Sequence, residues 1–262
     1  MLLTESFTFN NLYSYMGEVY YLFIIAANDG TSCIFEIINN LRMKIITRII
    51  TVLLIVFAVT TVYAQQPPFY NDIQQFKKLD SAHFPPKQAV LFIGSSSFTF
   101  WKDVQEYFPQ HTIINRGFGG SSLPDLIRYA DDIVFAYDPK QVVIYCGEND
   151  LAASDTVSAA TVTQRFITFF TMIRNKYPRI PVLYVSMKPS PSREHLMPKM
   201  DAGNGAIEEY LKKQKRTVYV DAYHLMLDAN GKPRKELFVE DMLHMNKNGY
   251  AIWQKAIGPY LK

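Results

Sequence analysis

Short apolar runs alternate with longer helix-forming segments through most of the chain, and this alternation constrains the fold most strongly. The apolar runs predict strands at residues 89–93, 112–115, 141–145, 181–186 and 217–220. The segments between and around them predict helices at residues 70–79, 123–135, 158–177, 199–215 and 247–261. Strands separated by helices pair in parallel, and the helices then cover both faces of the sheet. The sequence therefore predicts a single α/β domain with a five-stranded parallel sheet.

The longest apolar stretch lies before this predicted domain, at residues 49–64. A methionine and two basic residues precede it closely, and a small residue, Ala64, stands at its end. A positive region, an apolar region and a small-residue exit are typical of a secretory signal peptide. We therefore expect residues 43–64 to be a cleaved signal peptide, and residues 1–42 to be an upstream segment that precedes the true translation start. The alternative is an uncleaved membrane anchor at residues 49–64, a stretch shorter than the roughly 20 residues that a membrane span needs.

Composition narrows the class of protein further. A hydrophobic content of 48% in 262 residues allows one sizeable core, which we expect in a domain of residues 89–262 after a lead-in at residues 65–88. The formal net charge is +3 and is spread without a basic run, which argues against a nucleic-acid partner. Cys33 precedes the predicted cleavage point and Cys146 lies in an apolar strand, so the processed chain cannot form an internal disulfide. We expect Cys146 to be a buried small hydrophobic residue.

Three polar clusters stand where the first three predicted strands end: Gly94-Ser95-Ser96, Gly119-Gly120 and Gly147-Glu148-Asn149. The carboxyl ends of parallel strands meet at one edge of a sheet, so these clusters are expected to lie together. Ser96 offers a nucleophilic hydroxyl, while N–H groups of the glycine-rich loop and the Asn149 amide can stabilise an oxyanion. Each cluster alone also has a simpler interpretation. Ser96 can cap a helix, the glycines can form a tight turn, and Asn149 can be a turn residue.

A fourth cluster, Asp241-Met242-Leu243-His244, places a carboxylate three residues before an imidazole. At this spacing both side chains can project from one helical turn or tight loop. A carboxylate bound to one ring nitrogen would leave the other nitrogen free to accept a proton from a hydroxyl. The alternative is an exposed pair that caps the helix expected at residues 247–261. The other histidines have no metal-ligand spacing, so no metal or other cofactor is expected. Residues 188–198 predict a polar loop beside the site, in which His195 is expected to be a surface residue.

Taken together, the four clusters resemble the SGNH hydrolases, also called GDSL esterases and lipases, over residues 90–261. The chain is most similar to the branch that includes the platelet-activating-factor acetylhydrolase catalytic subunits, with residues 115–121 matching well. The resemblance implies a flavodoxin-like three-layer α/β/α sandwich, a catalytic triad and an oxyanion hole. The matching residues are Ser96, Asp241 and His244 for the triad, and Ser96, Gly120 and Asn149 for the oxyanion hole.

Two positions depart from the family pattern. Ser95 stands where the Gly-Asp-Ser motif has aspartate, and Glu148 replaces a commoner small residue. Because that aspartate is not the triad acid, we expect its loss to bear on the structure of the loop rather than on the reaction.

The predicted function is hydrolysis of short-chain carboxylic esters, acetyl esters above all, of a carbohydrate or a lipid through an acyl-enzyme. The expected partner is a small-molecule or polysaccharide ester, with no nucleic acid and no membrane once the signal is cleaved. The expected location is secreted or periplasmic, or membrane-anchored if residues 49–64 are retained. The alternative function is an extracytoplasmic module that binds a glycan or a lipid without turning it over.

Overall fold

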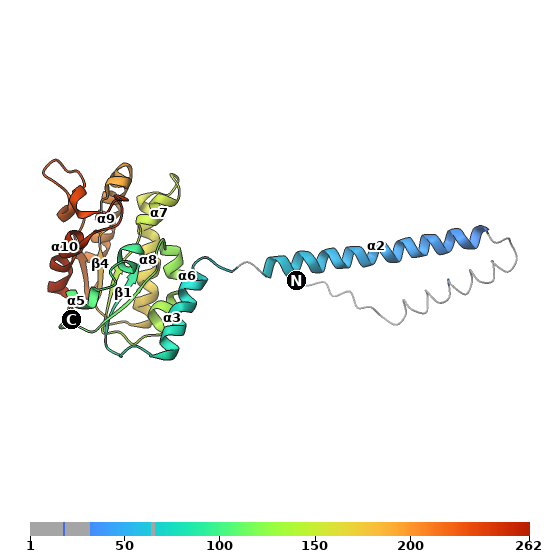
Figure 1. The fold of residues 1–262 in the computed structure, drawn as a ribbon, viewed down its shortest axis with the longest axis horizontal. Coiled ribbons are helices and arrows are strands. Elements are labelled where there is room, and N and C mark those ends of the chain that lie inside the picture. The colour runs from blue at the N-terminus through green and yellow to red at the C-terminus, as the bar shows by residue number, and fades with distance from the viewer. Residues whose placement is uncertain (1–17, 19–31, 64–65) are drawn as a thin grey trace. The chain divides into compact units, whose positions relative to one another are not determined.

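The computed structural model describes Glu18, residues 32–63 and residues 66–262. The chain divides into two compact units, Met1–Gln66 and Pro67–Lys262. In the first unit, helix α2 runs from Ser32 to Tyr63 (Figure 1). The predicted cleavage point after Ala64 and most of the predicted upstream segment lie outside the described residues. Within the part of the chain that is described, no helix is long and apolar enough to cross a membrane.

The second unit is built on a five-stranded parallel sheet with the strand order β2-β1-β3-β4-β5. The strands are β1 (Val90–Gly94), β2 (Ile113–Gly117), β3 (Gln141–Tyr145), β4 (Val182–Val185) and β5 (Thr217–Val220). Strand β1 lies between β2 and β3, so Gly94 pairs with Gly117 on one side and with Tyr145 on the other. After β1 the chain forms β2 on one side of that strand and β3 on the other side. In parallel sheets, ligands bind beyond the carboxyl ends of the strands at such a change of direction.

Helices cover both faces of this sheet (Figure 1). One face carries α3 (Tyr70–Ala82), α6 (Leu123–Arg128), the π-helical segment η1 (Asp131–Phe135), α8 (Ala159–Lys176) and α9 (Met197–Lys212). The other carries α4 (Ser96–Thr99), α5 (Val104–Tyr107) and α10 (Lys247–Ile257). The remaining helical segments of this unit are α7 (Glu148–Ala153), η2 (Pro191–Leu196), η3 (His224–Met226), η4 (Lys235–Leu237) and η5 (Gly258–Tyr260).

Alternate residues of β1 enter two different hydrophobic cores. Leu91 and Ile93 belong to the core beneath α8 and α9, whereas Val90 and Phe92 belong to the core beneath α4 and α10. Successive side chains of a strand point to opposite faces, and both faces of this sheet are covered. The strand is therefore apolar at every position, which is why the sequence shows a continuous apolar run and no alternation.

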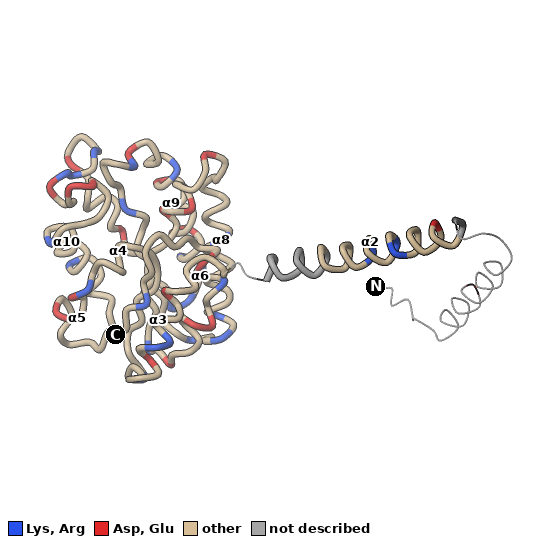
Figure 2. Tube along the Cα trace, turned by 45° about the vertical axis from the view of Figure 1, so that its right-hand side comes forward, with Lys and Arg blue, Asp and Glu red and all other residues tan. Residues whose placement is uncertain are grey.

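The predicted three-layer α/β/α sandwich with five parallel strands is confirmed. The helix expected at residues 123–135 differs in one respect, because it ends at Arg128 and is followed by the π-helical turn η1. There the N–H of Ala136 donates to the carbonyl of Asp131 at 2.9 Å, and this wider turn buries Ile133 and Val134 in the core. In the domain, basic and acidic residues are interspersed along the chain (Figure 2).

Candidate active site

The first loop of the site follows β1 and presents Ser96 at the start of α4. Gly94 has a φ of 146°, and a Cβ there would lie only 1.8 Å from the carbonyl oxygen of Tyr145. Only glycine allows β1 to pass so close to β3 at this point. The N–H of Ser95 donates to the same carbonyl oxygen at 3.1 Å, and the carbonyl of Ser95 accepts N–H groups from the first turn of α4. The turn that presents Ser96 therefore forms with serine in place of the family's aspartate.

The second loop, between β2 and α6, carries the paired glycines. A Cβ on Gly119 would lie 3.9 Å from the Cβ of Ser96, so the loop passes directly beside the serine. Gly120 has a φ of 84°, in the left-handed region that favours glycine. Within the described residues, the N–H groups of Ser96 and Gly120 donate no hydrogen bond to another protein group. Both donors are therefore free to bind a negatively charged oxygen.

The third loop places Asn149 in the first turn of α7, after β3. Its amide Nδ2 donates to the carbonyl oxygen of Ser121 at 2.9 Å, and its Oδ1 accepts from Nη1 of Arg193 at 3.0 Å. An amide nitrogen carries two N–H groups, and the bond to Ser121 uses one of them. The second N–H of Asn149 remains available as an oxyanion donor.

Ser121 is fully buried and joins these three loops to one another. Its hydroxyl donates to the carbonyl oxygen of Gly94 at 3.2 Å, and its carbonyl accepts from the Asn149 amide. The thiol of Cys146, buried as predicted, also points at this carbonyl at 3.7 Å. Ser121 was not predicted as a site residue, and its only signal in the sequence was its position next to Gly120.

The segment from Asp241 to His244 is a tight turn, closed by a hydrogen bond of 2.9 Å from the N–H of Val239 to the carbonyl of His244. One oxygen of Asp241 accepts the N–H groups of Leu243 and His244, both at 2.9 Å. The other oxygen lies 2.5 Å from Nδ1 of the His244 ring. On the opposite side of the ring, Nε2 lies 3.0 Å from the Ser96 hydroxyl oxygen. The structure thus places the three predicted triad residues in one continuous chain of hydrogen bonds.

The electrostatics of this turn favour an ionised Asp241. Burial raises the pKa of its carboxyl. Hydrogen bonds from the backbone and ring of His244 and from the backbone of Leu243 lower the pKa by more than burial raises it, to about 2. An ionised carboxylate on Nδ1 keeps the ring proton there, so that Nε2 is free to accept the proton of Ser96. The alternative role for the pair, capping α10, is not what the structure shows, because Asn246 caps that helix.

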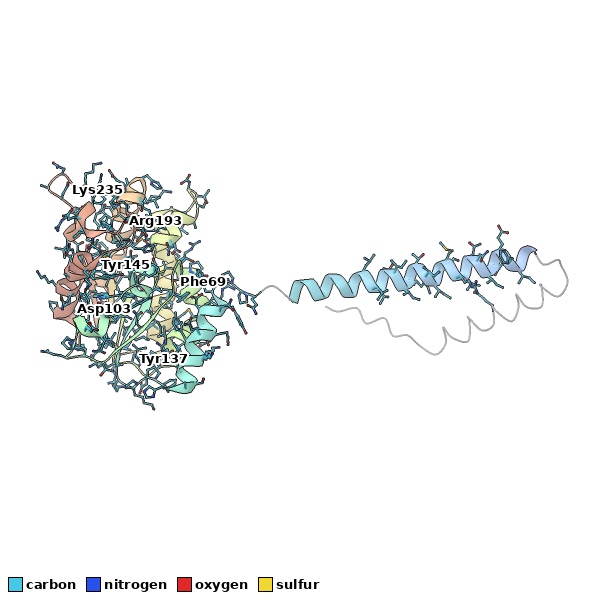
Figure 3. The ribbon with its side chains drawn as sticks, viewed as in Figure 1. Phe69, Asp103, Tyr137, Tyr145, Arg193 and Lys235 are labelled. Carbon is cyan, nitrogen blue, oxygen red and sulfur yellow. The ribbon has the colours of Figure 1, made fainter. Side chains whose placement is uncertain are left out.

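Glu148 forms a buried charge cluster behind Asn149. Its carboxylate is 5% exposed and accepts from Nζ of Lys188 at 3.2 Å, from Nη1 of Arg193 at 2.8 Å and from the hydroxyl of Tyr145. Figure 3 labels two members of this cluster, Arg193 and, below it, Tyr145. Burial raises the pKa of Glu148, but the two cations and the Tyr145 hydroxyl outweigh it, so the pKa lies below its ordinary value. Burial also lowers the pKa of Lys188, and the charge of Glu148 opposes that change.

An apolar ring packs against the imidazole. The ring of Phe100 meets the His244 ring edge to face, with centroids 4.7 Å apart, and half of Phe100 is exposed. Met242 is also exposed, and its left-handed φ of 55° marks the centre of the Asp–His turn. The carbonyl of Met242 accepts the N–H of Ser192 at 3.0 Å, which ties this turn to η2.

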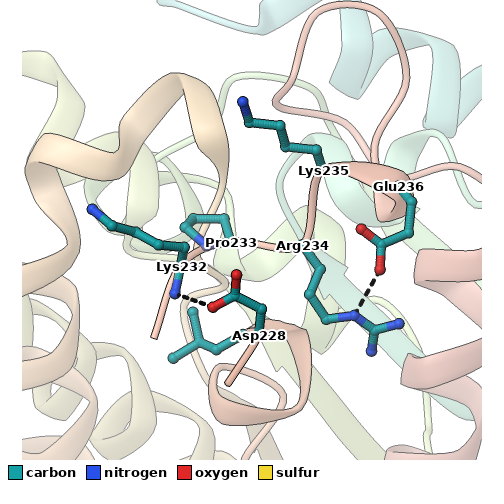
Figure 4. A pocket seen from close by; sticks show the side chains of 7 residues that line it. Asp228, Lys232, Pro233, Arg234, Lys235 and Glu236 are labelled. Carbon is teal, nitrogen blue, oxygen red and sulfur yellow. Dashed lines mark hydrogen bonds and ion pairs between the residues drawn. The ribbon is translucent and has the colours of Figure 1, made fainter. Parts of the chain in front are cut away.

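A surface hollow lies beside η2, at the turn of residues 227–236 (Figure 4). Its charged groups are largely used within the turn: Asp228 accepts the N–H of Lys232 at 2.9 Å, and Arg234 pairs with Glu236 at 2.9 Å. The side chain of Lys232 pairs with Glu194 of η2. The hollow holds no predicted site residue. We interpret the turn of residues 227–236 as a structural support for η2.

All the predicted site residues lie on the loops at the carboxyl edge of the sheet or on the turn that meets them. His195 is exposed, as predicted for a surface histidine. Lys188 and Arg193 were missed, although the loop that carries them was expected to border the site. A loop has no periodicity from which the direction of a long side chain could be inferred.

Among the described residues, no three His, Cys, Asp or Glu side chains are grouped as metal ligands.

Comparisons with known proteins fit this geometry. The family model described as the GDSL-like lipase/acylhydrolase family matches residues 92–252. No curated protein matches the chain. Among solved structures, a Streptococcus pneumonia protein provisionally described as a platelet activating factor has a TM-score of 0.65 and 22% identity, covering 73% of this chain and 92% of its own. A GDSL-like lipase from Bacteroides thetaiotaomicron has a TM-score of 0.62 and 21% identity, covering 71% and 95%.

A third solved structure, a variant of an acetyl xylan esterase from Geobacillus stearothermophilus, has a TM-score of 0.53 and 14% identity, covering 67% of this chain and 95% of its own. At these identities the structures share the fold. The family match extends over more than half of the chain, so the chain belongs to the GDSL-like lipase/acylhydrolase family. It is a serine ester hydrolase, and the predicted resemblance to the SGNH hydrolases is confirmed. The enzyme interpretation therefore replaces the alternative of a binding module without turnover.

Proposed function

We propose that this esterase acts outside the cytoplasm on short-chain carboxylic esters, acetyl esters above all, of a carbohydrate or a lipid. The observation that carries the proposal is the chain of hydrogen bonds from Asp241 through His244 to Ser96. A hydroxyl is a weak nucleophile by itself and becomes effective when an oriented base removes its proton.

The reaction proceeds in two steps. His244 takes the proton of Ser96 through Nε2 as the serine oxygen attacks the ester carbonyl, and the protonated imidazole then gives this proton to the leaving alcohol. The acyl group stays on Ser96. Water next attacks the acyl-enzyme, with His244 again acting first as base and then as acid, and the carboxylic acid is released. Asp241 holds the ring orientation throughout and stabilises the imidazolium.

Three N–H donors that have no acceptor within the described residues can stabilise the oxyanion that forms in each step. They are the free N–H groups of Ser96 and Gly120 and the unused N–H of the Asn149 amide. Donors that are held in place before the reaction cost no reorganisation when negative charge develops, and each is typically worth about 3–4 kcal/mol in the transition state. The left-handed φ of 84° explains why glycine is favoured at position 120.

The preference for a short acyl group has two sources of support. Phe100 packs against the imidazole and Met242, two residues before it, is exposed; apolar groups here suit an acyl group or a leaving group with little charge. The fold is also shared with an acetyl xylan esterase, which makes acetylated carbohydrate the first class of substrate to test. The proposed location rests on the sequence of residues 43–64.

The test measures hydrolysis of p-nitrophenyl esters from acetyl to decanoyl, together with acetate release from acetylated xylan and from a short-chain lipid ester. We expect the highest kcat/KM on acetyl esters. Ser96→Ala is expected to fold, to lose hydrolysis and to escape labelling by a fluorophosphonate probe. Labelling of Ser96→Ala at another residue, with full activity, would end the assignment of the nucleophile. The mass of the exported protein tests the location, because cleavage after Ala64 leaves residues 65–262.

A further inference from the structure

The Asn149 amide is held in one of its two possible orientations. Its oxygen faces Nη1 of Arg193 at 3.0 Å, and its nitrogen faces the carbonyl of Ser121 at 2.9 Å. If the amide were rotated by half a turn, its N–H groups would meet the guanidinium donors and its oxygen would meet the Ser121 carbonyl. Donor would then face donor and acceptor would face acceptor. The contacts with Arg193 and with the Ser121 carbonyl therefore together determine which end of the amide can serve the oxyanion hole.

Arg193 is itself fixed by a buried partner. Its Nη1 also donates to Glu148 at 2.8 Å, so one nitrogen binds the carboxylate and the Asn149 oxygen together. The two N–H groups of a guanidinium nitrogen diverge in a fixed plane, so binding the first acceptor sets the direction of the second bond. Glu148 is in turn held by Lys188 and by the hydroxyl of Tyr145. Because Arg193 binds both groups, it fixes the Asn149 side chain relative to Glu148.

The backbone around this cluster is anchored independently on both sides. The buried side chain of Asn204 in α9 accepts the N–H of Met187 at 2.8 Å and donates to its carbonyl at 3.0 Å, which fixes the residue before Lys188. On the other side, η2 is joined to the Asp–His turn through the N–H of Ser192. The cluster of Glu148, Lys188 and Arg193 therefore links the segment after β4 firmly to the first turn of α7.

The charges of this cluster also suit an oxyanion hole. Lys188 and Arg193 carry two positive charges against the single negative charge of Glu148, and all three side chains are largely withdrawn from water. The charge of Arg193 lies against the oxygen end of the amide that would donate to the oxyanion. Fixed charges in a site from which water is excluded act more strongly than they would in solution.

We infer that Arg193 is a positioning residue for the oxyanion hole: held by buried Glu148, it orients the Asn149 amide so that an N–H faces the reacting carbonyl. Arg193 acts through Asn149 and is not itself assigned a contact with the substrate. This inference rests on the proposed function, because it requires Asn149 to be an oxyanion donor. Its consequence is that the contribution of Arg193 to the rate disappears once the Asn149 amide is removed.

The test is a double-mutant cycle on p-nitrophenyl acetate with Arg193→Met, Asn149→Ala and the double variant. A misplaced donor costs up to about 10²-fold, so we expect Arg193→Met to lower kcat roughly 10- to 100-fold with little change in KM. Asn149→Ala should lower kcat by roughly 10²- to 10³-fold. The double variant should be no slower than Asn149→Ala alone. If the two losses multiply in the double variant, Arg193 does not act through Asn149 and the inference is overturned.

Two further variants separate a local role from a general loss of structure. Arg174→Met removes a guanidinium that binds backbone carbonyls before β4, at the opposite edge of the sheet, and should leave kcat unchanged. Arg193→Lys keeps a positive charge near Glu148 on a shorter side chain, and the same cycle applied to it decides the question if Arg193→Met does not fold. Full activity of Asn149→Ala would contradict the oxyanion assignment in the proposed function. Loss in Asn149→Ala with additive loss from Arg193 would contradict only the positioning role.

Discussion

Nε2 of His244 lies 3.0 Å from the hydroxyl oxygen of Ser96, although 148 residues separate them in the chain. The contact depends on how α10 packs over α4. The hydroxyl of Tyr250 in α10 donates to the carbonyl of Ser97 at 3.0 Å, and Trp253 packs against Phe98 with ring centroids 5.9 Å apart. These contacts bring the start of α10, and the turn before it, to the first residue of α4. The geometry of the triad is therefore set by the packing of the second core.

The chain contains an internal control for the proposed base. Asp221 and His224 form a second Asp-x-x-His pair with a ring-to-carboxylate distance of 2.8 Å, but that histidine is about two-thirds exposed. We expect His244→Ala to lower kcat for p-nitrophenyl acetate by roughly 10²- to 10⁴-fold, as for loss of a general base. His224→Ala should leave kcat unchanged. Equal losses in the two variants, or none in either, would contradict the assignment of His244.

The low pKa of Asp241, about 2, predicts how it contributes to stability as a function of pH. A carboxyl whose pKa is depressed in the folded state stabilises the protein above its unfolded pKa, and the contribution is lost as pH falls through the folded pKa. Asp241→Asn should therefore be less stable than the wild type at pH 5–7, and the gap should narrow from about pH 4 toward pH 2. Urea unfolding across this range measures the gap. A difference in unfolding free energy that stays constant with pH would show that ionisation of Asp241 does not stabilise the fold.

The buried charge cluster predicts unequal costs for substituting Glu148 and Lys188. Glu148→Gln leaves Lys188 almost fully buried without a charged partner, and breaking a buried pair in this way costs about 3–5 kcal/mol. Lys188→Met removes one cation, but Glu148 keeps Arg193 and the Tyr145 hydroxyl. We therefore expect Lys188→Met to cost clearly less than Glu148→Gln in urea unfolding at pH 7. The reverse order would mean that Arg193 does not support Glu148 as the geometry indicates.

Gly94 is expected to be irreplaceable for a steric reason. A Cβ at this position would overlap the carbonyl oxygen of Tyr145, and the φ of 146° is unfavourable for any other residue. Gly94→Ala should lower stability by roughly 1–3 kcal/mol, as for other overpacked sites, and should lower kcat because Ser96 follows two residues later. Gly205→Ala is the matched control. It lies in α9, and no atom outside the helix's own nearby backbone comes within 4 Å of an added Cβ. Alanine there should stabilise the helix by about 0.5–1 kcal/mol.

Much of the fold follows from local patterns in the sequence. The apolar runs located all five strands to within two residues at either end, because a strand covered on both faces must be apolar throughout. The same pattern located Ser96, Gly120 and Asn149 at one edge of the sheet, since each follows the carboxyl end of a parallel strand. The hydrophobic pattern does not distinguish a π-helical turn from an α-helix, so it predicts residues 131–135 as a continuation of the α-helix.

Local patterns along the chain therefore fix the parallel sheet, the order of its loops and the residue types available at its carboxyl edge. The Asp-x-x-His spacing alone could not separate Asp241–His244 from Asp221–His224, because only the packing of α10 on α4 brings one of these pairs to the serine. Nor could the sequence show that Glu148, Lys188 and Arg193 meet behind Asn149. These residues lie on loops after different strands, and the burial that makes their charges interact strongly exists only when the tertiary structure excludes water.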